Sequence, residues 1–191
     1  GDWQELAAGS TEFVGYDTLS SPAHILRYRQ VKDKAGDRYQ IVLDRTPFYA
    51  ESGGQVGDQG WLVQGDEKVE VVDTKRENNL VVHFTKTLPK DVGSTLIAQV
   101  DAHRRALTQR NHTGTHLLQN ALRKVLGTHV EQKGSLVAPD RLRFDISHFA
   151  KITPDELARI EQEANAMVRA DLALEERRET PIKEALGMGA M

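Results

Sequence analysis

The apolar residues of this chain change their spacing near Val100. Before that point, short apolar or alternating segments are separated by breaks rich in glycine, asparagine and aspartate, which is typical of strands. After it, Leu118, Leu122 and other apolar residues recur at helical spacing, and Gly127 stands where that helix should end. We therefore expect an α+β fold with a domain boundary near Val100.

The first half contains about six expected strands, which suits a small antiparallel β-barrel. They cover the segment around Ile25 and Tyr28 and residues 39–43, 61–63, 69–72, 80–84 and 95–100. The second half is expected to hold a helix over 101–126, a hairpin of 130–137 with 141–146, a strand over 171–177 and a helix over 181–186. We divide the chain into a linker over 1–12, a β-barrel domain over 13–100 and an α+β core over 101–191.

One more helix is expected between the hairpin and the last strand. A capping box at Thr153, with Pro154 at the first helical position, predicts that it runs to about Ala170. The residues that should form its buried face are Leu157, Ile160, Ala164, Met167 and Val168.

Composition limits the kind of protein. The 191 residues include no cysteine, which excludes disulfides and thiolate zinc ligands within them. A formal net charge of −3 gives no overall attraction to nucleic acid, so an RNA contact would need a local basic patch. Basic residues concentrate between positions 104 and 143: Arg104, Arg105, Arg110, Arg123, Lys124, Lys133, Arg141 and Arg143. Neither a signal peptide nor a membrane span is evident, so we expect a cytoplasmic protein.

His112 and His116 form the most specific chemical pattern. Four residues apart on a helix, they project from one face and can hold one metal ion through two imidazoles. The glutamate that follows the first histidine in metalloproteases is absent, and the spacing can also arise by chance among seven histidines. A zinc site would need further ligands, for which the local candidates are His129, Glu131, Asp145 and His148.

The loop of residues 51–60 contains four glycines. It is either a flexible hairpin connection or a place where Gly53 and Gly54 let the backbone approach a ligand. In the second case Gln55 and Asp58 would supply polar contacts. Gln132, on an expected hairpin strand, would face solvent unless that strand packs beside the histidine helix.

Several segments, in this order, resemble the editing region of bacterial alanyl-tRNA synthetases. They read FVGY (13–16), DRTPFYAESGGQVGD (44–58), NHTGTHLL (111–118), QKGSLV (132–137) and LRFD (142–145). The similarity covers nearly the whole chain from about residue 11. It implies a small barrel followed by a zinc-dependent editing core that is shared with threonyl-tRNA synthetases, and hydrolysis of the ester of tRNA(Ala) mischarged with serine or glycine.

The resemblance also assigns roles to single residues. It puts Zn²⁺ on His112 and His116 together with a later cysteine and histidine, and it makes Gln132 and Thr115 catalytic. The substrate contacts that it implies are Gly53, Gly54, Gln55, Asp58 and Arg143. Because the chain begins without methionine and stops before the later cysteine, we expect a truncated piece that binds zinc weakly or not at all. Aminoacylation, ATP and Mg²⁺ would belong to the synthetase domain that the family places upstream.

Two alternatives remain beside this interpretation. A free-standing editing protein would hydrolyse the same ester without the parent synthetase, but it should carry its own second pair of ligands. A non-catalytic module would only dock tRNA(Ala) and connect other domains of the parent synthetase, with the histidine pair empty.

Overall fold

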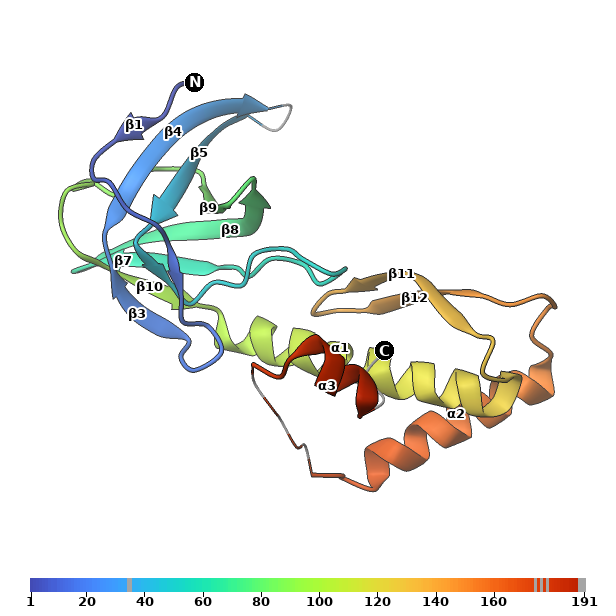
Figure 1. Ribbon diagram of the computed structural model, residues 1–191. Helices are drawn as coiled ribbons and strands as arrows, with labels where there is room; N and C mark the ends of the chain where they lie inside the picture. The colour runs from blue at the N-terminus through green and yellow to red at the C-terminus, as the bar shows by residue number, and fades with distance from the viewer. Residues whose placement is uncertain (34–35, 174, 176, 178, 189–191) are drawn as a thin grey trace.

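The structure is a computed structural model that describes residues 1–33, 36–173, 175, 177 and 179–188 (Figure 1). Its strands before the first helix are β1 (Gln4–Glu5), β2 (Glu12–Phe13), β3 (Ser20–Ala23), β4 (Ile25–Asp33), β5 (Gly36–Leu43), β6 (Arg45–Thr46), β7 (Gly60–Gln64), β8 (Glu67–Glu77), β9 (Leu80–Thr85) and β10 (Leu96–Val100). All six expected strands are confirmed. The sequence did not predict β1, β2, β3 and β6, which have only two to four residues each and no apolar run.

Eight of these strands form one antiparallel sheet in the order β1-β4-β5-β9-β8-β7-β10-β3. Strand β3, at one end of this order, is separated from β4 by His24 alone. Strand β3 pairs with β10, and β4 pairs with β5, so these two consecutive strands belong to opposite ends of the sheet order. The sheet therefore curls, and its two ends come together at the segment of β3 and β4. Its core includes the fully buried side chains of Ile41, Leu43 and Phe48.

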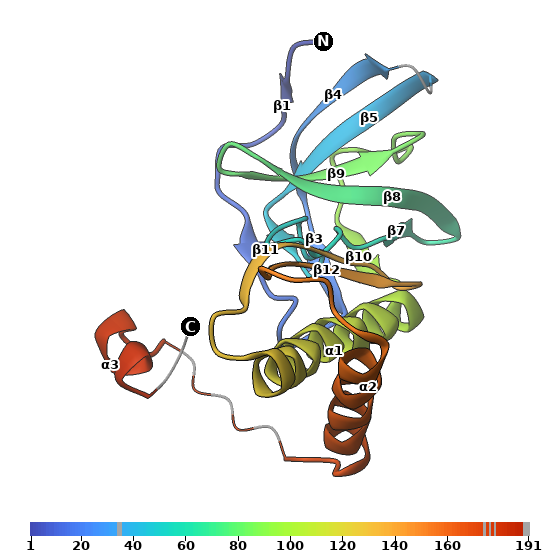
Figure 2. The same ribbon diagram turned by 90° about the vertical axis from the view of Figure 1, so that its right-hand side faces the viewer.

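The second half contains two long helices and a hairpin. Its elements are α1 (Ala102–Leu126), β11 (Glu131–Val137), β12 (Leu142–Ser147), α2 (Pro154–Arg169) and α3 (Ile182–Gly187). The side chain of Asp101 caps α1 and Gly127 ends it, while the capping box at Thr153 starts α2 as expected. The hairpin and α2 pack against different sides of α1 (Figure 2). The α+β prediction is confirmed.

Two details of the second half were predicted wrongly. Leu157 and Val168 are 59% and 60% exposed, because α2 is covered only along the row of Ile160, Ala164 and Met167 that faces α1. The strand expected over 171–177 is absent from the described residues 171–173, 175 and 177, and residues 174 and 176 lie outside the described part. None of the described helices has the length and apolar character needed to span a lipid bilayer.

Candidate functional site

The glycine-rich loop of residues 51–60 packs against strand β11. Val137 N donates to Gly54 O (2.8 Å), and Val56 N donates to Val137 O (3.0 Å). Gly54 has φ +84°, and a Cβ there would lie 2.3 Å from Ser135 Oγ and 2.6 Å from Ser135 O. Only glycine permits this approach, so the loop and the hairpin are held together by backbone contacts. In Figure 1 the loop, drawn in turquoise, reaches from the sheet to the hairpin.

This contact brings Gln55 onto helix α1. Its side chain is largely buried (8% exposed), and its Oε1 accepts a hydrogen bond from Nδ1 of His112 at 2.7 Å. Partial burial lowers the pKa of His112 below 6.5, and the neighbouring His116 lowers it further. A lowered pKa favours the neutral imidazole, and the bond to Gln55 places its proton on Nδ1 and its lone pair on Nε2.

The histidine pair lies between two pockets. The imidazole rings of His112 and His116 are 5.2 Å apart, centroid to centroid. His112 and Gln55 line a pocket of about 530 Å³, and His116 and Gln132 line another of about 740 Å³. The hairpin strand that carries Gln132 thus packs beside the histidine helix, which was the condition for Gln132 to face a site.

A β-bulge lies next to Gln132. The pairing of β11 with β12 changes register between Gln132, opposite Ile146, and Gly134, opposite Asp145. A bulge leaves one residue, here Lys133, outside the ladder and changes the direction of neighbouring side chains. Such irregularities recur beside active sites, and this one adjoins the residue that lines the pocket of His116.

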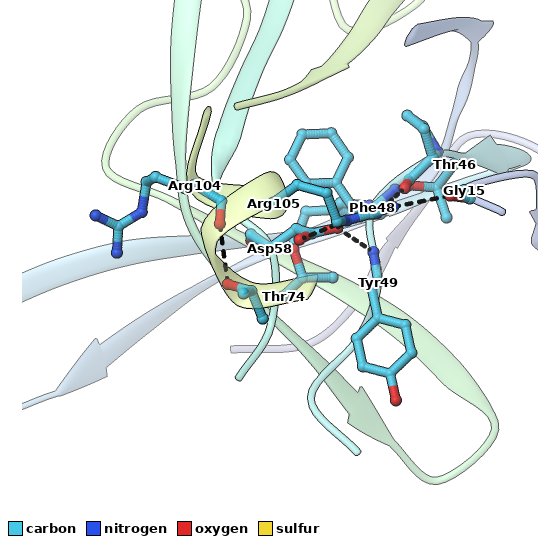
Figure 3. A network of polar contacts seen from close by, with 11 residues as sticks. Gly15, Thr46, Phe48, Tyr49, Asp58, Thr74, Arg104 and Arg105 are labelled. Carbon is cyan, nitrogen blue, oxygen red and sulfur yellow. Dashed lines mark hydrogen bonds and ion pairs between the residues drawn. The ribbon is translucent and has the colours of Figure 1, made fainter. Parts of the chain in front are cut away.

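Asp58 joins the glycine-rich loop to α1 through an ion pair. Its carboxylate is bonded to the guanidinium of Arg105, and the two side chains are 5% and 6% exposed. Arg105 also donates to Gly15 O (2.8 Å) and to Pro47 O (2.9 Å). Tyr49 N donates to Asp58 Oδ2 (2.7 Å), and Figure 3 shows Tyr49, Asp58, Arg105 and Gly15 in this network. These bonds use the polar atoms of Asp58 inside the protein, so its contribution is to join the sheet to α1.

Two other expected site residues lie outside both pockets. The hydroxyl of Thr115 is buried and donates to Asn111 O (3.0 Å) within its own helix. Arg143 is exposed on β12 and pairs with Asp145. The structure therefore brings together Gln55, His112, His116 and Gln132 and leaves Thr115 and Arg143 apart from them.

The histidine pair fits two positions of a zinc shell. A neutral imidazole that donates its other N–H to a protein oxygen is the usual form of a zinc-binding histidine, and the bond to Gln55 gives His112 this form. Among the described residues, no group of three or more His, Cys, Asp or Glu side chains could hold a metal ion. The further ligand candidates have other partners: Asp145 pairs with Arg143, Glu131 with Lys133, and His129 with His148.

Sequence reasoning missed two groups of residues at this site. Arg105 was grouped with the basic band, although it is buried and completes the bond network of Asp58. The rings of Phe13, Tyr16 and Tyr49 line the pocket of His112, and only their place in the recognised segments drew attention to them. Both groups depend on contacts across long sequence separations, which spacing alone does not reveal.

The chain is similar to known tRNA synthetases. A family model described as "tRNA synthetases class II (A)" matches residues 2–104. The alanine–tRNA ligase of Parabacteroides distasonis is 57% identical over 191 residues, and that of Bacteroides fragilis is 58% identical over the same length. The alanine–tRNA ligase of Cytophaga hutchinsonii is 55% identical. In each case all of this chain is covered, and it spans 22% of the relative's length.

Proposed function

The chain belongs to the class II (A) tRNA synthetases, and from this premise we propose that it is part of an alanine–tRNA ligase that hydrolyses mischarged tRNA(Ala). The bond broken would be the ester between the ribose of the tRNA and a serine or glycine. The observation that carries this proposal is the convergence of Gln55, His112, His116 and Gln132 from a loop, a helix and a hairpin.

The chain's own residues suit ester hydrolysis by water. His112 is fixed by Gln55 with Nε2 unprotonated, so it can bind a metal or accept a proton. Zn²⁺, held by His112 and His116 and completed by ligands outside the described residues, would supply a polarised water or orient the substrate. The amide of Gln132 would hydrogen-bond the attacking water or the aminoacyl group.

The pocket of His116 and Gln132 suits a polar aminoacyl group. It is also lined by Gln119, Asn120, Arg123 and Glu131, so every lining side chain can form hydrogen bonds. A site built to bond the hydroxyl of serine discriminates against alanine, because its polar groups then remain unpaired. This chemistry favours serine over alanine as the hydrolysed aminoacyl group.

The proposed function also assigns a role to each part of the chain. The curled sheet would be a small β-barrel over 13–100, residues 1–12 a linker, and 101–191 an editing core. The partners would be tRNA(Ala) and other domains of the synthetase, and Arg110, Lys124 and Arg141 are exposed side chains of the basic band that suit phosphate contacts.

Release of serine from seryl-tRNA(Ala) tests this function. It should be measured for this chain and for a chain extended along its reading frame, with alanyl-tRNA(Ala) as the control substrate. We expect the extended chain to be faster, because two imidazoles make half of a tetrahedral shell. Equal rates for the two chains would refute the proposal that residues of the extension complete the metal site. If neither chain hydrolyses the ester but both bind tRNA(Ala), the non-catalytic docking module replaces this proposal.

A role in aminoacylation is a second candidate function, and the extent of the family match supports it. The family model covers residues 2–104 and ends before the histidine pair, which favours a contribution of the curled sheet to aminoacylation with ATP and Mg²⁺. Alanine-dependent exchange between ATP and pyrophosphate separates the two functions. If this chain catalyses the exchange, the aminoacylation role holds; if only ester hydrolysis is found, it is refuted for this chain.

A further inference from the structure

Three polar side chains meet where the two ends of the curled sheet come together. His24 is the residue between β3 and β4, Asp44 lies between β5 and β6, and Thr95 directly precedes β10. The antiparallel pairing of β3 with β10 sets Leu96 opposite Ala23. The next pair along this register is Thr95 with His24. The strands thus bring together side chains that are 20 and 71 positions apart in the sequence (Figure 1).

The three side chains are joined through both nitrogens of the His24 imidazole. Its Nδ1 lies 3.2 Å from Asp44 Oδ2, and its Nε2 lies 2.8 Å from Thr95 Oγ1. An ionised carboxylate can only accept hydrogen bonds, so the neutral imidazole carries its proton on Nδ1 and donates it to Asp44. Nε2 then holds the lone pair and accepts a hydrogen bond from the Thr95 hydroxyl. Hydroxyl, imidazole and carboxylate follow one another in the order found in enzymes with hydroxyl nucleophiles.

Asp44 orients His24 with both of its carboxylate oxygens. Oδ1 accepts a hydrogen bond from the backbone N–H of His24 (2.8 Å) while Oδ2 contacts the ring, and Asp44 N donates to His24 O (3.0 Å). The pairing of β4 with β5 also changes register between Ile25 and Arg27, so a β-bulge adjoins His24. Such bulges change the direction of side chains beside active sites. The imidazole is therefore held through the backbone of His24 as well as through its ring.

The three side chains can be reached from solvent. Those of His24 and Asp44 are 57% and 39% exposed, and Thr95 is exposed as well. None of them lines either pocket of the histidine pair on α1. We infer that Thr95 is a nucleophile for acyl transfer, which accepts an acyl group from an activated carboxylic ester. This activity does not depend on the proposed hydrolysis of mischarged tRNA.

The acyl transfer balances between these residues and the ester. Thr95 Oγ1 forms a bond to the carbonyl carbon while its proton moves to Nε2 of His24, and Asp44 stabilises the resulting imidazolium. The bond between the carbonyl carbon and the alcohol oxygen then breaks. The alcohol leaves with the electron pair of that bond and takes up the proton from His24. The products are an ester on Thr95 and the free alcohol.

Reaction of the whole chain with p-nitrophenyl acetate tests the inference. Release of p-nitrophenol gives the rate, and mass spectrometry of peptides locates the acetyl group. Alkaline hydroxylamine removes this group from a threonine ester but not from a lysine amide. We expect Thr95 to be acetylated about 100-fold faster than the exposed Thr87, because an aligned general base contributes at least that much. Thr95→Val should abolish this adduct, and Thr95→Ser should retain it.

Two histidine variants separate acyl transfer from a hydrogen bond that is merely structural. His24→Gln removes the base and should slow the acetylation of Thr95 about 100-fold. His103→Gln changes an exposed histidine on α1 and should leave the rate unchanged. Acetylation of Thr95 no faster than that of Thr87, an undiminished rate in His24→Gln, or an adduct on His24 alone overturns the inference. If His24→Gln does not fold, the comparison of Thr95 with Thr87 in the parent chain still decides.

Discussion

The hydrogen bond from His112 Nδ1 to Gln55 Oε1 decides which nitrogen of the imidazole carries the proton. It joins a loop residue to a helix residue 57 positions later, and it leaves Nε2 as the lone-pair atom. The sequence predicted both residues as site residues but not their contact. Spacing predicts neighbours within one helix, as for His112 and His116, and it contains no information on which loop reaches that helix.

Replacing this amide with a carboxylate should change the titration of His112. In Gln55→Glu, a negative charge within hydrogen-bond distance of the ring favours the imidazolium, so the pKa of His112 should rise from its lowered value. Nuclear magnetic resonance titration of the ring protons of His112 measures this change. Gln162→Glu on α2 is the control, and an unchanged pKa of His112 in Gln55→Glu would contradict the bond.

Among the structural elements, the glycine-rich loop could be recognised from its sequence, but the element that it contacts could not. Four glycines in ten residues allowed two interpretations, a flexible hairpin connection or a close approach of the backbone to a ligand. The structure shows a close approach at Gly54, where the neighbour is strand β11. The strands and helices themselves were predictable because each depends on local periodicity and capping, whereas the strand order β9-β8-β7-β10-β3 depends on contacts that no local pattern records.

The loop contact can be tested by comparing adjacent glycines. Gly53 and Gly54 both have positive φ, but an added Cβ meets nothing within 4 Å at Gly53 and collides with Ser135 at Gly54. Gly53→Ala should cost only the backbone penalty, about 1 kcal/mol. Gly54→Ala should lower the free energy of unfolding by about 1–3 kcal/mol more, because overpacking is added. Urea unfolding measures both, and equal losses would contradict the contact with β11.

A buried histidine makes the curled sheet sensitive to acid. His83 on β9 is fully buried, bonded to Ile41 O (3.0 Å) and to Thr46 Oγ1 (2.7 Å), and burial lowers its pKa from 6.5 to about 4. Between these pH values the unfolded chain binds more protons than the folded chain. The contribution of His83 to the free energy of unfolding is therefore complete above about pH 6.5. It falls as the pH drops toward 4, by about 3 kcal/mol in all.

Unfolding free energies measured from pH 7 to pH 4 check this dependence. His83→Gln should flatten the decline relative to the parent chain, even if the variant is less stable at pH 7. His103→Gln, which changes an exposed histidine, should retain it. A decline of the same size in His83→Gln would show that other groups cause it.

Across the whole molecule, helix α1 connects the curled sheet to the hairpin and α2. Its first turns are fixed to the sheet by Asp58 and Arg105, 47 positions apart, and its middle carries the histidine pair to the loop and β11. The change of pattern near Val100 predicted where the sheet ends and α1 begins. It did not predict that a buried ion pair joins the two parts, since a charge near a boundary usually lies in solvent.

Removing the cation of this pair should destabilise the chain strongly. Arg105→Met leaves the carboxylate of Asp58 buried without its partner, which should cost about 3–5 kcal/mol of unfolding free energy. Arg104→Met changes the neighbouring exposed arginine and should cost less than about 0.5 kcal/mol. Urea unfolding of the two variants measures the difference, and similar small losses would contradict the role of the ion pair.

The most direct measurement of the proposed ester hydrolysis is serine release from seryl-tRNA(Ala) by the extended chain and its variants. His116→Ala and Gln132→Ala change exposed residues of one pocket, so both should fold normally, and each should slow release by about 100-fold or more. Gln162→Ala, on the exposed side of α2, should release serine at the parent rate. Release by His116→Ala and Gln132→Ala within twofold of the parent rate would contradict a hydrolytic site at the histidine pair.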